Sequence, residues 1–256
     1  MNHRNVNILF ILFILAWILL DRHYHLSPAA YGWILLVYVS VLFCGSYFIR
    51  LGYFFKSINK RQGNEKLIAL SFDDGPAASF TPAILDLLRE KQTECIFFCI
   101  GKNIPGNENM LKRMVDEGHL IGNHSYSHHV LFDLFGADKM LADLQQMNSV
   151  TEAVTGITPR FFRPPYGVTN PNLKKAVERG GFISIGWSIR SLDTVIRSEN
   201  RLLKKVIRSL TPGAILLFHD TSQVTVNILP ELIRQAEEKG YQIVRLDKLL
   251  NLDPYV

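Results

Sequence analysis

The sequence predicts an α/β domain with a parallel sheet, preceded by two membrane-spanning helices. Residues 6–55 are almost entirely apolar, whereas residues 67–256 have the mixed composition of a soluble domain. In that second part, short apolar segments typical of strands alternate about seven times with segments typical of helices. Such alternation implies a parallel sheet covered by helices, and it leaves open whether the sheet is a closed barrel or an open layer.

The N-terminal part contains two apolar segments, at about 6–22 and 29–49. The first has an uninterrupted apolar run that is slightly short for a bilayer span, and the second is long enough to cross. A signal peptide is the alternative for the first segment, but no small-residue cleavage site follows it directly. We therefore expect residues 1–56 to form a membrane anchor of two transmembrane helices.

The basic residues around these segments predict the orientation of the anchor. Arg4 precedes the first segment and Arg22 lies in the connection, while five basic residues follow the second segment: Arg50, Lys56, Lys60, Arg61 and Lys66. The positive-inside rule then places both termini of an integral plasma-membrane protein in the cytoplasm. A single span of opposite orientation would instead place the main domain outside the cell.

Composition limits the possible partners. The net charge of +5 includes no long basic run with interleaved aromatic residues, which argues against nucleic acid as a partner. Cys44 lies in an apolar segment, and Cys95 and Cys99 share a predicted strand with their side chains about 13 Å apart. That separation is too large for a disulfide. The sequence does not indicate an oligomeric state.

After a polar linker at 57–66, the second domain occupies residues 67–256. Its first strand begins at Leu67 and stops at Gly75-Pro76, and Thr81 is the expected N-cap of the next helix, which ends near residue 91. The other expected helices are 107–117, 137–155, 171–179, 199–210 and 226–239. The other expected strands are 94–100, 119–122, 160–163, 182–187, 214–218 and 241–244.

Ionisable residues lie at the ends of two predicted strands. Asp73 and Asp74 end the first strand, and His219 follows the strand 214–218. Two adjacent acids in such a place are costly without a cation, a partner or a catalytic task. Because the carboxyl ends of parallel strands meet at one edge of the sheet, we expect His219 to lie near the two acids.

A histidine-rich segment is the strongest indication of a metal site. Four of the eight histidines fall between residues 119 and 129. His124 and His128 are four residues apart, so they would share one face if the segment were helical, a spacing used for first-row metals. His129 is an alternative second ligand, and a polar surface loop without metal is the other interpretation.

Two prolines follow Arg163 and fix the backbone before Tyr166. The amide of Tyr166 is then held rigidly and could bind an oxyanion. A rigid turn with a surface arginine is the alternative.

Four short segments, in order, resemble the signature segments of the polysaccharide deacetylase family, also called the NodB-homology or carbohydrate esterase family 4 domain. They are Ser-Phe-Asp-Asp-Gly-Pro, His-Ser-Tyr-Ser-His, Arg-Pro-Pro-Tyr-Gly and Leu-Leu-Phe-His-Asp. The resemblance runs from about Lys66 to about Leu250. It implies a distorted (β/α) barrel with its site at the carboxyl ends of the strands.

The resemblance also implies roles for individual residues. One divalent metal ion, expected to be zinc with cobalt, nickel or manganese as alternatives, would be bound by Asp74, His124 and His128. Asp73 would be the general base, and Arg163 would tune it. His219 would be the general acid, and Asp193 would orient it. Contacts to the substrate or its oxyanion would come from Tyr166, Trp187 and Leu217.

One segment departs from the family pattern. After Trp187 the family usually has an acid where this chain has Arg190, and a second tryptophan where it has Thr194, while Asp193 matches. Arg190 could bind an anionic group on the sugar through a bidentate contact, or it could form a structural ion pair.

The expected function is a metal-dependent hydrolase that removes N-acetyl groups from amino sugars of the N-acetylglucosamine type, in a polysaccharide or glycan such as peptidoglycan. A deacetylase or deformylase of a lipid-linked sugar on the cytoplasmic face is one alternative. A non-catalytic carbohydrate-binding protein is the other.

Overall fold

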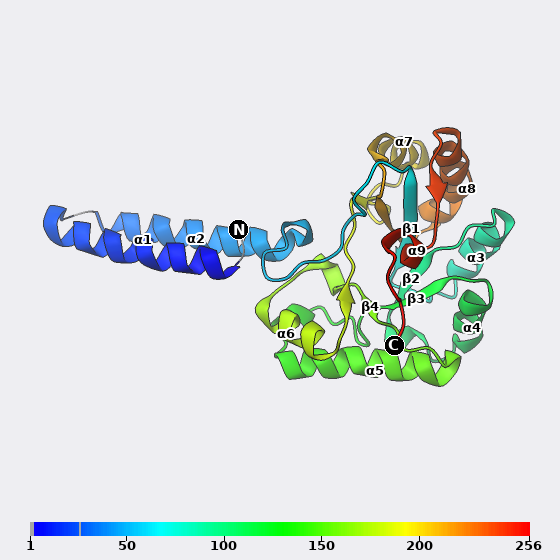
Figure 1. Ribbon diagram of the computed structural model, residues 1–256, viewed down its shortest axis with the longest axis horizontal. Coiled ribbons are helices and arrows are strands. Elements are labelled where there is room, and N and C mark those ends of the chain that lie inside the picture. Colours follow the sequence, from blue (N-terminus) through cyan, green and yellow to red (C-terminus); the bar gives the residue numbers. More distant parts are fainter. Residues whose placement is uncertain (1–2, 26) are drawn as a thin grey trace.

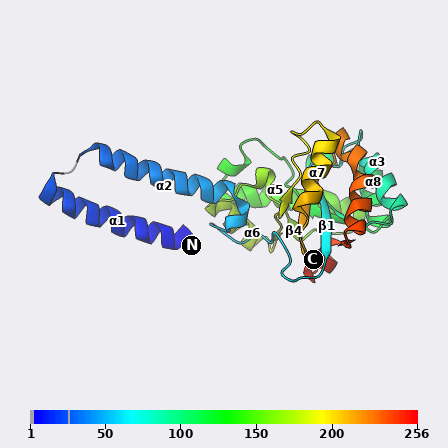
Figure 2. The same cartoon turned by 90° about the horizontal axis from the view of Figure 1, so that it is seen from above.

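The computed structural model describes residues 3–25 and 27–256 and consists of two parts. A helical hairpin, α1 (His3–Tyr24) and α2 (Ala29–Tyr47), projects from an α/β domain (Figures 1 and 2). Both helices are long and apolar enough to cross a membrane, a test that a signal sequence near the N-terminus also passes. Most of their side chains are exposed. The two expected helices are therefore present, a few residues from the predicted bounds.

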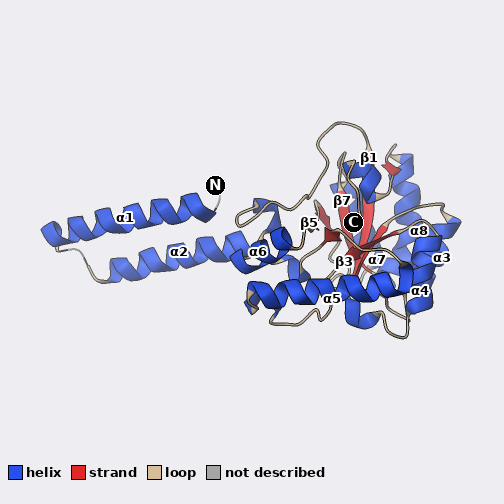
Figure 3. Ribbon diagram, turned by 60° about the horizontal axis from the view of Figure 1, so that its bottom comes forward, coloured by secondary structure: helices blue, strands red, loops and turns tan. Residues whose placement is uncertain are grey.

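All strand pairs of the domain are parallel, as the alternating pattern predicted. The strands are β1 (Leu67–Asp73), β2 (Ile96–Cys99), β3 (Leu120–Asn123), β4 (Phe161–Phe162), β5 (Ile183–Ser184), β6 (Ile189–Arg190), β7 (Ile215–His219) and β8 (Gln242–Ile243). Their order is β5-β4-β3-β2-β1-β7-β6, and β8 pairs with the start of β1. The result is a curled sheet enclosed by helices, a half-barrel that agrees with the expected distorted (β/α) barrel (Figure 3).

The helices of the domain pack as neighbours around this sheet (Figure 1). They are α3 (Thr81–Glu90), α4 (Glu108–Asp116), α5 (Ala137–Thr155), α6 (Pro171–Arg179), α7 (Glu199–Ser209), α8 (Gln223–Glu238) and α9 (Leu246–Leu250). Each helix expected from the sequence is present within about three residues of its predicted ends, a normal scatter for boundaries. The strand β6 and the helix α9 were not expected, since elements of two and five residues leave no periodic pattern.

Strand β1 is the centre of the sheet because it pairs with β2, β7 and β8. Its residues from Ile68 to Asp73 are all buried. The ring of Phe72 stacks on Phe97 with centroids 5.2 Å apart and lies 6.1 Å from Phe218. The register aligns Asp73 with His219 of β7, which brings the two predicted strand ends together.

Thr81 is not the N-cap of α3, contrary to the sequence-based expectation. The capping position falls on Phe80, without a side-chain hydrogen bond. The Thr81 hydroxyl instead donates to Asp220 Oδ2 at 2.6 Å and accepts from the amide of Ala77 at 2.8 Å. The Thr81 hydroxyl therefore binds the buried carboxyl group of Asp220 and does not cap the helix.

The segment 57–66, expected to be a linker, is hydrogen-bonded to the domain. Ser57 is buried, and its hydroxyl lies 2.7 Å from that of Ser184. The backbone of Ile58 bridges to Ile185, and that of Lys60 bridges to Ala214. The segment therefore connects the residues beyond β5 with those before β7, where the described strands do not pair with one another.

The end of α2 is also fixed to the domain. The hydroxyl of Ser46 donates to the carbonyl of Thr169 at 2.6 Å, and the Thr169 amide donates back to Ser46. Three residues beyond the helix, Arg50 donates from Nε to the carbonyl of Trp187 at 3.1 Å. The domain therefore presents the loops around residues 169 and 187 toward the base of the hairpin.

Replacing Phe72 by alanine should destabilise the domain by about 3–5 kcal/mol, because it removes a fully buried ring between two others. Chemical denaturation of the detergent-solubilised protein, followed by near-ultraviolet circular dichroism, would measure the change. Val195→Ala is the control, since Val195 is 70% exposed and should cost no more than about 0.5 kcal/mol. Similar losses in both variants would contradict the central place of β1 in the core.

Candidate active site

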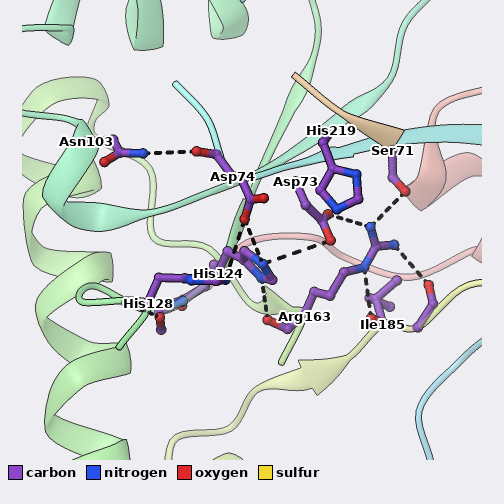
Figure 4. Close-up of polar contacts among 12 residues, drawn as sticks. Ser71, Asp73, Asp74, Asn103, His124, His128, Arg163, Ile185 and His219 are labelled. Atoms are coloured by element: carbon purple, nitrogen blue, oxygen red, sulfur yellow. Dashed lines mark hydrogen bonds and ion pairs between the residues drawn. The ribbon is translucent and has the colours of Figure 1, made fainter. Parts of the chain in front are cut away.

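The residues expected to carry chemistry meet in one pocket of about 220 Å³ at the carboxyl ends of the strands. Eight of the ten predicted site residues line it: Asp73, Asp74, His124, His128, Tyr166, Trp187, Leu217 and His219. The other two, Arg163 and Asp193, are fully buried directly behind Asp73 and His219. Figure 4 shows Asp74 and the two imidazoles on one side of the site, with Asp73, Arg163 and His219 on the other.

Three side chains of this pocket form a set that could hold a metal ion. The Nε2 atoms of His124 and His128 lie 3.6 Å and 3.5 Å from Asp74 Oδ1 (Figure 4). The donor atoms of all three residues lie within 4.8 Å of one another. Two imidazoles and one carboxylate on one side leave further coordination positions open, the arrangement typical of catalytic first-row metal sites. The donor set therefore fits one divalent ion.

The two histidines do not lie on a helix. They lie on a loop after β3, in which Ser125 (φ 64°) and His128 (φ 42°) adopt left-handed backbone conformations. The loop is held by hydrogen bonds: the His128 amide donates to Ser125 Oγ, and the amide of Tyr126 donates to Asp143 of α5. The turn brings the two ring centroids to 4.9 Å from each other. The spacing of four residues therefore places the imidazoles side by side through a loop and not through a helix.

The imidazole of His124 is held in the form that a metal requires. His124 Nδ1 lies 2.8 Å from the carbonyl of Arg163, which can only accept, so the proton is on Nδ1 and the lone pair of Nε2 faces Asp74. Burial lowers the pKa of His124 to about 3, so the ring is neutral at physiological pH. Burial also lowers the pKa of His128, against the opposing charge of Asp74. Metal binding would thus displace no proton from Nε2 of His124.

Asp73 is held by a buried arginine. Arg163 Nη1 donates to Asp73 Oδ1 at 2.6 Å, and its other bonds go to the Ser71 hydroxyl and to the carbonyls of Ile185 and Gly186. The second oxygen of Asp73 lies 4.0 Å from His124 Nε2 and so faces the metal-binding residues. Burial raises the pKa of Asp73, and the charge of Arg163 opposes that rise.

His219 and Asp193 form the second polar pair. His219 Nδ1 lies 2.8 Å from Asp193 Oδ1, and the His219 amide donates to the other carboxylate oxygen. Burial alone would lower the pKa of His219, but its hydrogen bond to Asp193 and the charge of that carboxylate outweigh burial and raise the pKa to about 9. His219 therefore carries a proton at neutral pH, with Nε2 free to donate into the pocket.

Three supporting residues were not expected from the sequence. Ser71 bonds both Arg163 and the carbonyl of Leu216, Thr225 donates to Asp193 at 2.5 Å, and Asp143 accepts from the histidine loop. Only Ser71 leaves a sequence signal, as the one hydroxyl within an apolar strand. The other two come from helices whose polar residues look like solvent-facing ones until the helix is packed.

Arg190 and Thr194, where the chain departs from the family pattern, both line the pocket. Within residues 3–25 and 27–256, no carboxylate lies within ion-pair distance of Arg190. Its guanidinium lies 6.0 Å from the centre of the Trp187 ring and is exposed. The structural ion pair is thus absent, and an anionic ligand remains the interpretation to pursue.

The curled parallel sheet carries two imidazoles and a carboxylate at one edge, together with an Asp–Arg pair and an Asp–His pair. This combination is typical of metal-dependent hydrolases. Comparison with known proteins agrees. The sequence model of the polysaccharide deacetylase family matches residues 60–184. A peptidoglycan-N-acetylglucosamine deacetylase of Bacillus cereus is 34% identical over 190 residues, 73% of this chain and 69% of that protein. The chain belongs to the polysaccharide deacetylase family, and it is a hydrolase.

Solved structures resemble this one closely. The crystal structure of a peptidoglycan N-acetylglucosamine deacetylase superposes with a TM-score of 0.73 at 32% identity, over 77% of this chain and 94% of that chain. A carbohydrate esterase family 4 pseudoenzyme from Bacillus anthracis gives a TM-score of 0.70 at 28% identity, over 75% and 68% of the two chains. The same fold thus occurs in an active enzyme and in a pseudoenzyme, so activity has to be argued from the residues of the site.

The Asp193–His219 pair predicts a measurable titration. A pKa of about 9 lies above the value of about 6.5 for an unfolded histidine, so the pair stabilises the fold below pH 6.5 and this stabilisation is lost as the pH rises through 9. In metal-free protein, nuclear magnetic resonance should show His219 titrating near 9. Asp193→Asn should move that titration toward about 6.5.

Asp138→Asn is the control for this measurement, because Asp138 is an exposed carboxylate on α5 whose partner is Arg179. It should leave the His219 titration where it is. A His219 titration that is the same in Asp193→Asn and in the wild type would show that Asp193 does not set the charge of the imidazole.

Proposed function

We propose that the protein removes N-acetyl groups from amino sugars of the N-acetylglucosamine type in a glycan such as peptidoglycan. The observation that supports this most is the convergence of a metal-binding set, a buried Asp–Arg pair and an imidazolium on one pocket. Two of the three similar proteins named above are peptidoglycan N-acetylglucosamine deacetylases, and they support the choice of substrate class. The residue roles below are part of the proposal.

Asp74, His124 and His128 would hold the metal ion, with zinc as our first choice and cobalt, nickel or manganese as alternatives. When bound, a divalent cation at this place supplies activation of water and polarisation of the acetamide carbonyl. The protein contributes neutral imidazoles and an orientation fixed by the Arg163 carbonyl.

Asp73 would be the general base. Its carboxylate lies between Arg163 and the metal-binding residues, so it can accept a proton from a water molecule that attacks the acetyl carbon. Burial makes the anion more basic, and Arg163 fixes which oxygen faces the pocket. The hydrogen bond from Arg163 therefore orients the Asp73 carboxylate.

His219 would be the general acid. Cleavage of the C–N bond leaves an amine, which departs only when its nitrogen is protonated. The imidazolium held by Asp193 supplies that proton, and the products are acetate and a free amino sugar. The backbone amide of Tyr166 would stabilise the oxyanion, and Trp187 and Leu217 would form walls around the acetamide.

Metal-loaded protein should release acetate from a soluble N-acetylglucosamine oligomer, and a chelator should abolish the reaction until metal is restored. Asp73→Asn should lower kcat by about 100-fold or more while retaining the metal, because the base is lost and the ligands remain. His124→Ala should lose the metal, measured by elemental analysis of the dialysed protein.

Asp116→Asn, an exposed change of the same type on α4, is the matched control and should retain full activity. Full activity of Asp73→Asn would contradict the base role. If metal-loaded protein binds the glycan but releases no acetate, the protein is a non-catalytic carbohydrate-binding member of the family.

We further propose that α1 and α2 anchor the protein in the plasma membrane with the catalytic domain in the cytoplasm. Length and hydropathy of the two helices support the anchor, and the positive-inside count supports the orientation. With this orientation the enzyme would act on the N-acetylated amino sugars while they are lipid-linked at the cytoplasmic face, and not on the assembled glycan. An extracellular domain would instead admit the assembled cell-wall polymer as substrate.

A single-cysteine variant tests the orientation. Val256 is 92% exposed at the C-terminus, and the natural Cys95 and Cys99 are buried, so Val256→Cys in a Cys44→Ser background leaves one reactive thiol. A membrane-impermeant maleimide should label this variant only after the cells are permeabilised. Labelling of intact cells would place the catalytic domain outside and contradict the proposed orientation.

A further inference from the structure

A second hollow, here called the basic groove, lies next to the active site. It has a volume of about 430 Å³ and is lined by four cations, three hydroxyl side chains and one isoleucine: Arg50, Lys60, Arg190, Lys205, Ser188, Ser209, Thr211 and Ile189. Its lining includes no carboxylate. In the part of the chain that the structure describes, none of the four cations forms a salt bridge.

Four separate parts of the chain supply the cations. Arg50 follows α2, Lys60 belongs to the segment that bridges β5 and β7, Arg190 ends β6, and Lys205 lies on α7. Hydrogen bonds fix the positions: Arg50 donates to the carbonyl of Trp187, and Lys205 Nζ donates to the carbonyl of Arg190. The groove is therefore formed by tertiary structure and does not result from a local run of basic residues.

Holding these cations together is unfavourable without an anion. Burial, followed by the charge of Arg190, lowers the pKa of Lys205. Like charges in a concave surface focus a positive potential, and cationic donors are suited to phosphate oxygens. The hydroxyl groups of Ser188 and Ser209 donate to backbone carbonyls, so the charge of the groove comes from its four cations. The chemistry of the groove thus fits a phosphate or diphosphate better than a neutral sugar.

The groove and the catalytic pocket are neighbours, because Arg190 lines both. One molecule can therefore place an anionic group in the groove and an acetamide beside the metal-binding residues. The groove also adjoins the base of the hairpin, because Arg50 lies three residues after the end of α2. In a membrane-anchored protein, that end of the groove faces the bilayer surface.

We propose that the basic groove binds the phosphate or diphosphate of a lipid-linked saccharide, whose N-acetylated sugar enters the catalytic pocket while its lipid remains in the membrane. This proposal rests on the proposed deacetylase function and names its substrate class. Phospholipid headgroups offer related chemistry, and the neighbouring exposed cations of α7, Arg201, Lys204 and Arg208, would attract them. The groove differs from that surface because it adjoins the active site.

Full-length, metal-loaded protein in phosphatidylcholine nanodiscs tests the proposal with two substrates. One is N-acetylglucosamine joined to a polyprenol through diphosphate, and the other is the same sugar joined to the same polyprenol by a neutral glycosidic bond. We expect kcat/KM to be about tenfold higher or more for the diphosphate substrate, the effect of one or two charge-assisted hydrogen bonds. Arg190→Gln and Lys60→Gln should each reduce this preference several-fold.

Lys112→Gln is the matched control, because Lys112 is exposed on α4 and lies outside the groove. It should keep the preference of the wild type. Equal kcat/KM on both substrates, or variants that lower both by the same factor, would overturn the proposal. Added phosphatidylglycerol that inhibits the wild type but not Arg190→Gln would show that the groove binds bilayer headgroups instead.

Failure of the proposed function gives a different result. In that case the wild type releases no acetate from either lipid or from a soluble N-acetylglucosamine oligomer. Co-flotation of the same holoenzyme variants with vesicles that carry the diphosphate lipid then still tests the groove, since binding does not require turnover. Weaker flotation of Arg190→Gln than of Lys112→Gln would support the groove, and equal flotation would overturn it.

Discussion

The buried pair of Arg163 and Asp73 is the interaction on which the rest of the site depends. The guanidinium has no solvent exposure, and its donors reach β1 and the two residues that follow β5. The Arg163 carbonyl accepts from the His124 ring, so one residue orients both the aspartate and an imidazole of the candidate metal site. Loss of either partner would leave an uncompensated buried charge, which typically costs about 3–5 kcal/mol. The catalytic arrangement and the stability of this edge are thus coupled.

Parallel pairing explains why residues far apart in the chain act together. The register of β1 with β7 aligns Asp73 with His219. The strand β3, which pairs with β2, ends at the same edge, where the histidine loop begins. Each strand delivers its polar residues at the same edge, and packed elements behind them supply Asp193, Thr225 and Asp143. The sheet sets the positions, and the buried hydrogen bonds set the charge states.

The base of the hairpin relates the catalytic chemistry to a membrane surface. Arg50 donates to the carbonyl of Trp187, which lines the pocket, and Ser46 donates to the carbonyl of Thr169. The end of α2 is therefore hydrogen-bonded to loops of the catalytic domain. The departure from the family pattern at Arg190 occurs at the junction of the pocket and the basic groove. Arg190 therefore lies where the proposed substrate would enter the pocket.

The sequence alone determined the two apolar N-terminal helices and all strands and helices except β6 and α9, because buried strands and amphipathic helices follow from hydrophobic spacing. The cost of burying charge indicated the strand-end residues Asp73, Asp74 and His219. The full set of ten residues that meet in and behind the pocket came from the resemblance of four short segments to a known family. Only the tertiary structure decided the left-handed loop that joins His124 to His128, the partner of Thr81 and the helpers of Asp193. It also gathered the four cations of the basic groove from distant positions. These features depend on contacts between segments far apart in the chain, and such contacts leave no periodic signal within any one segment.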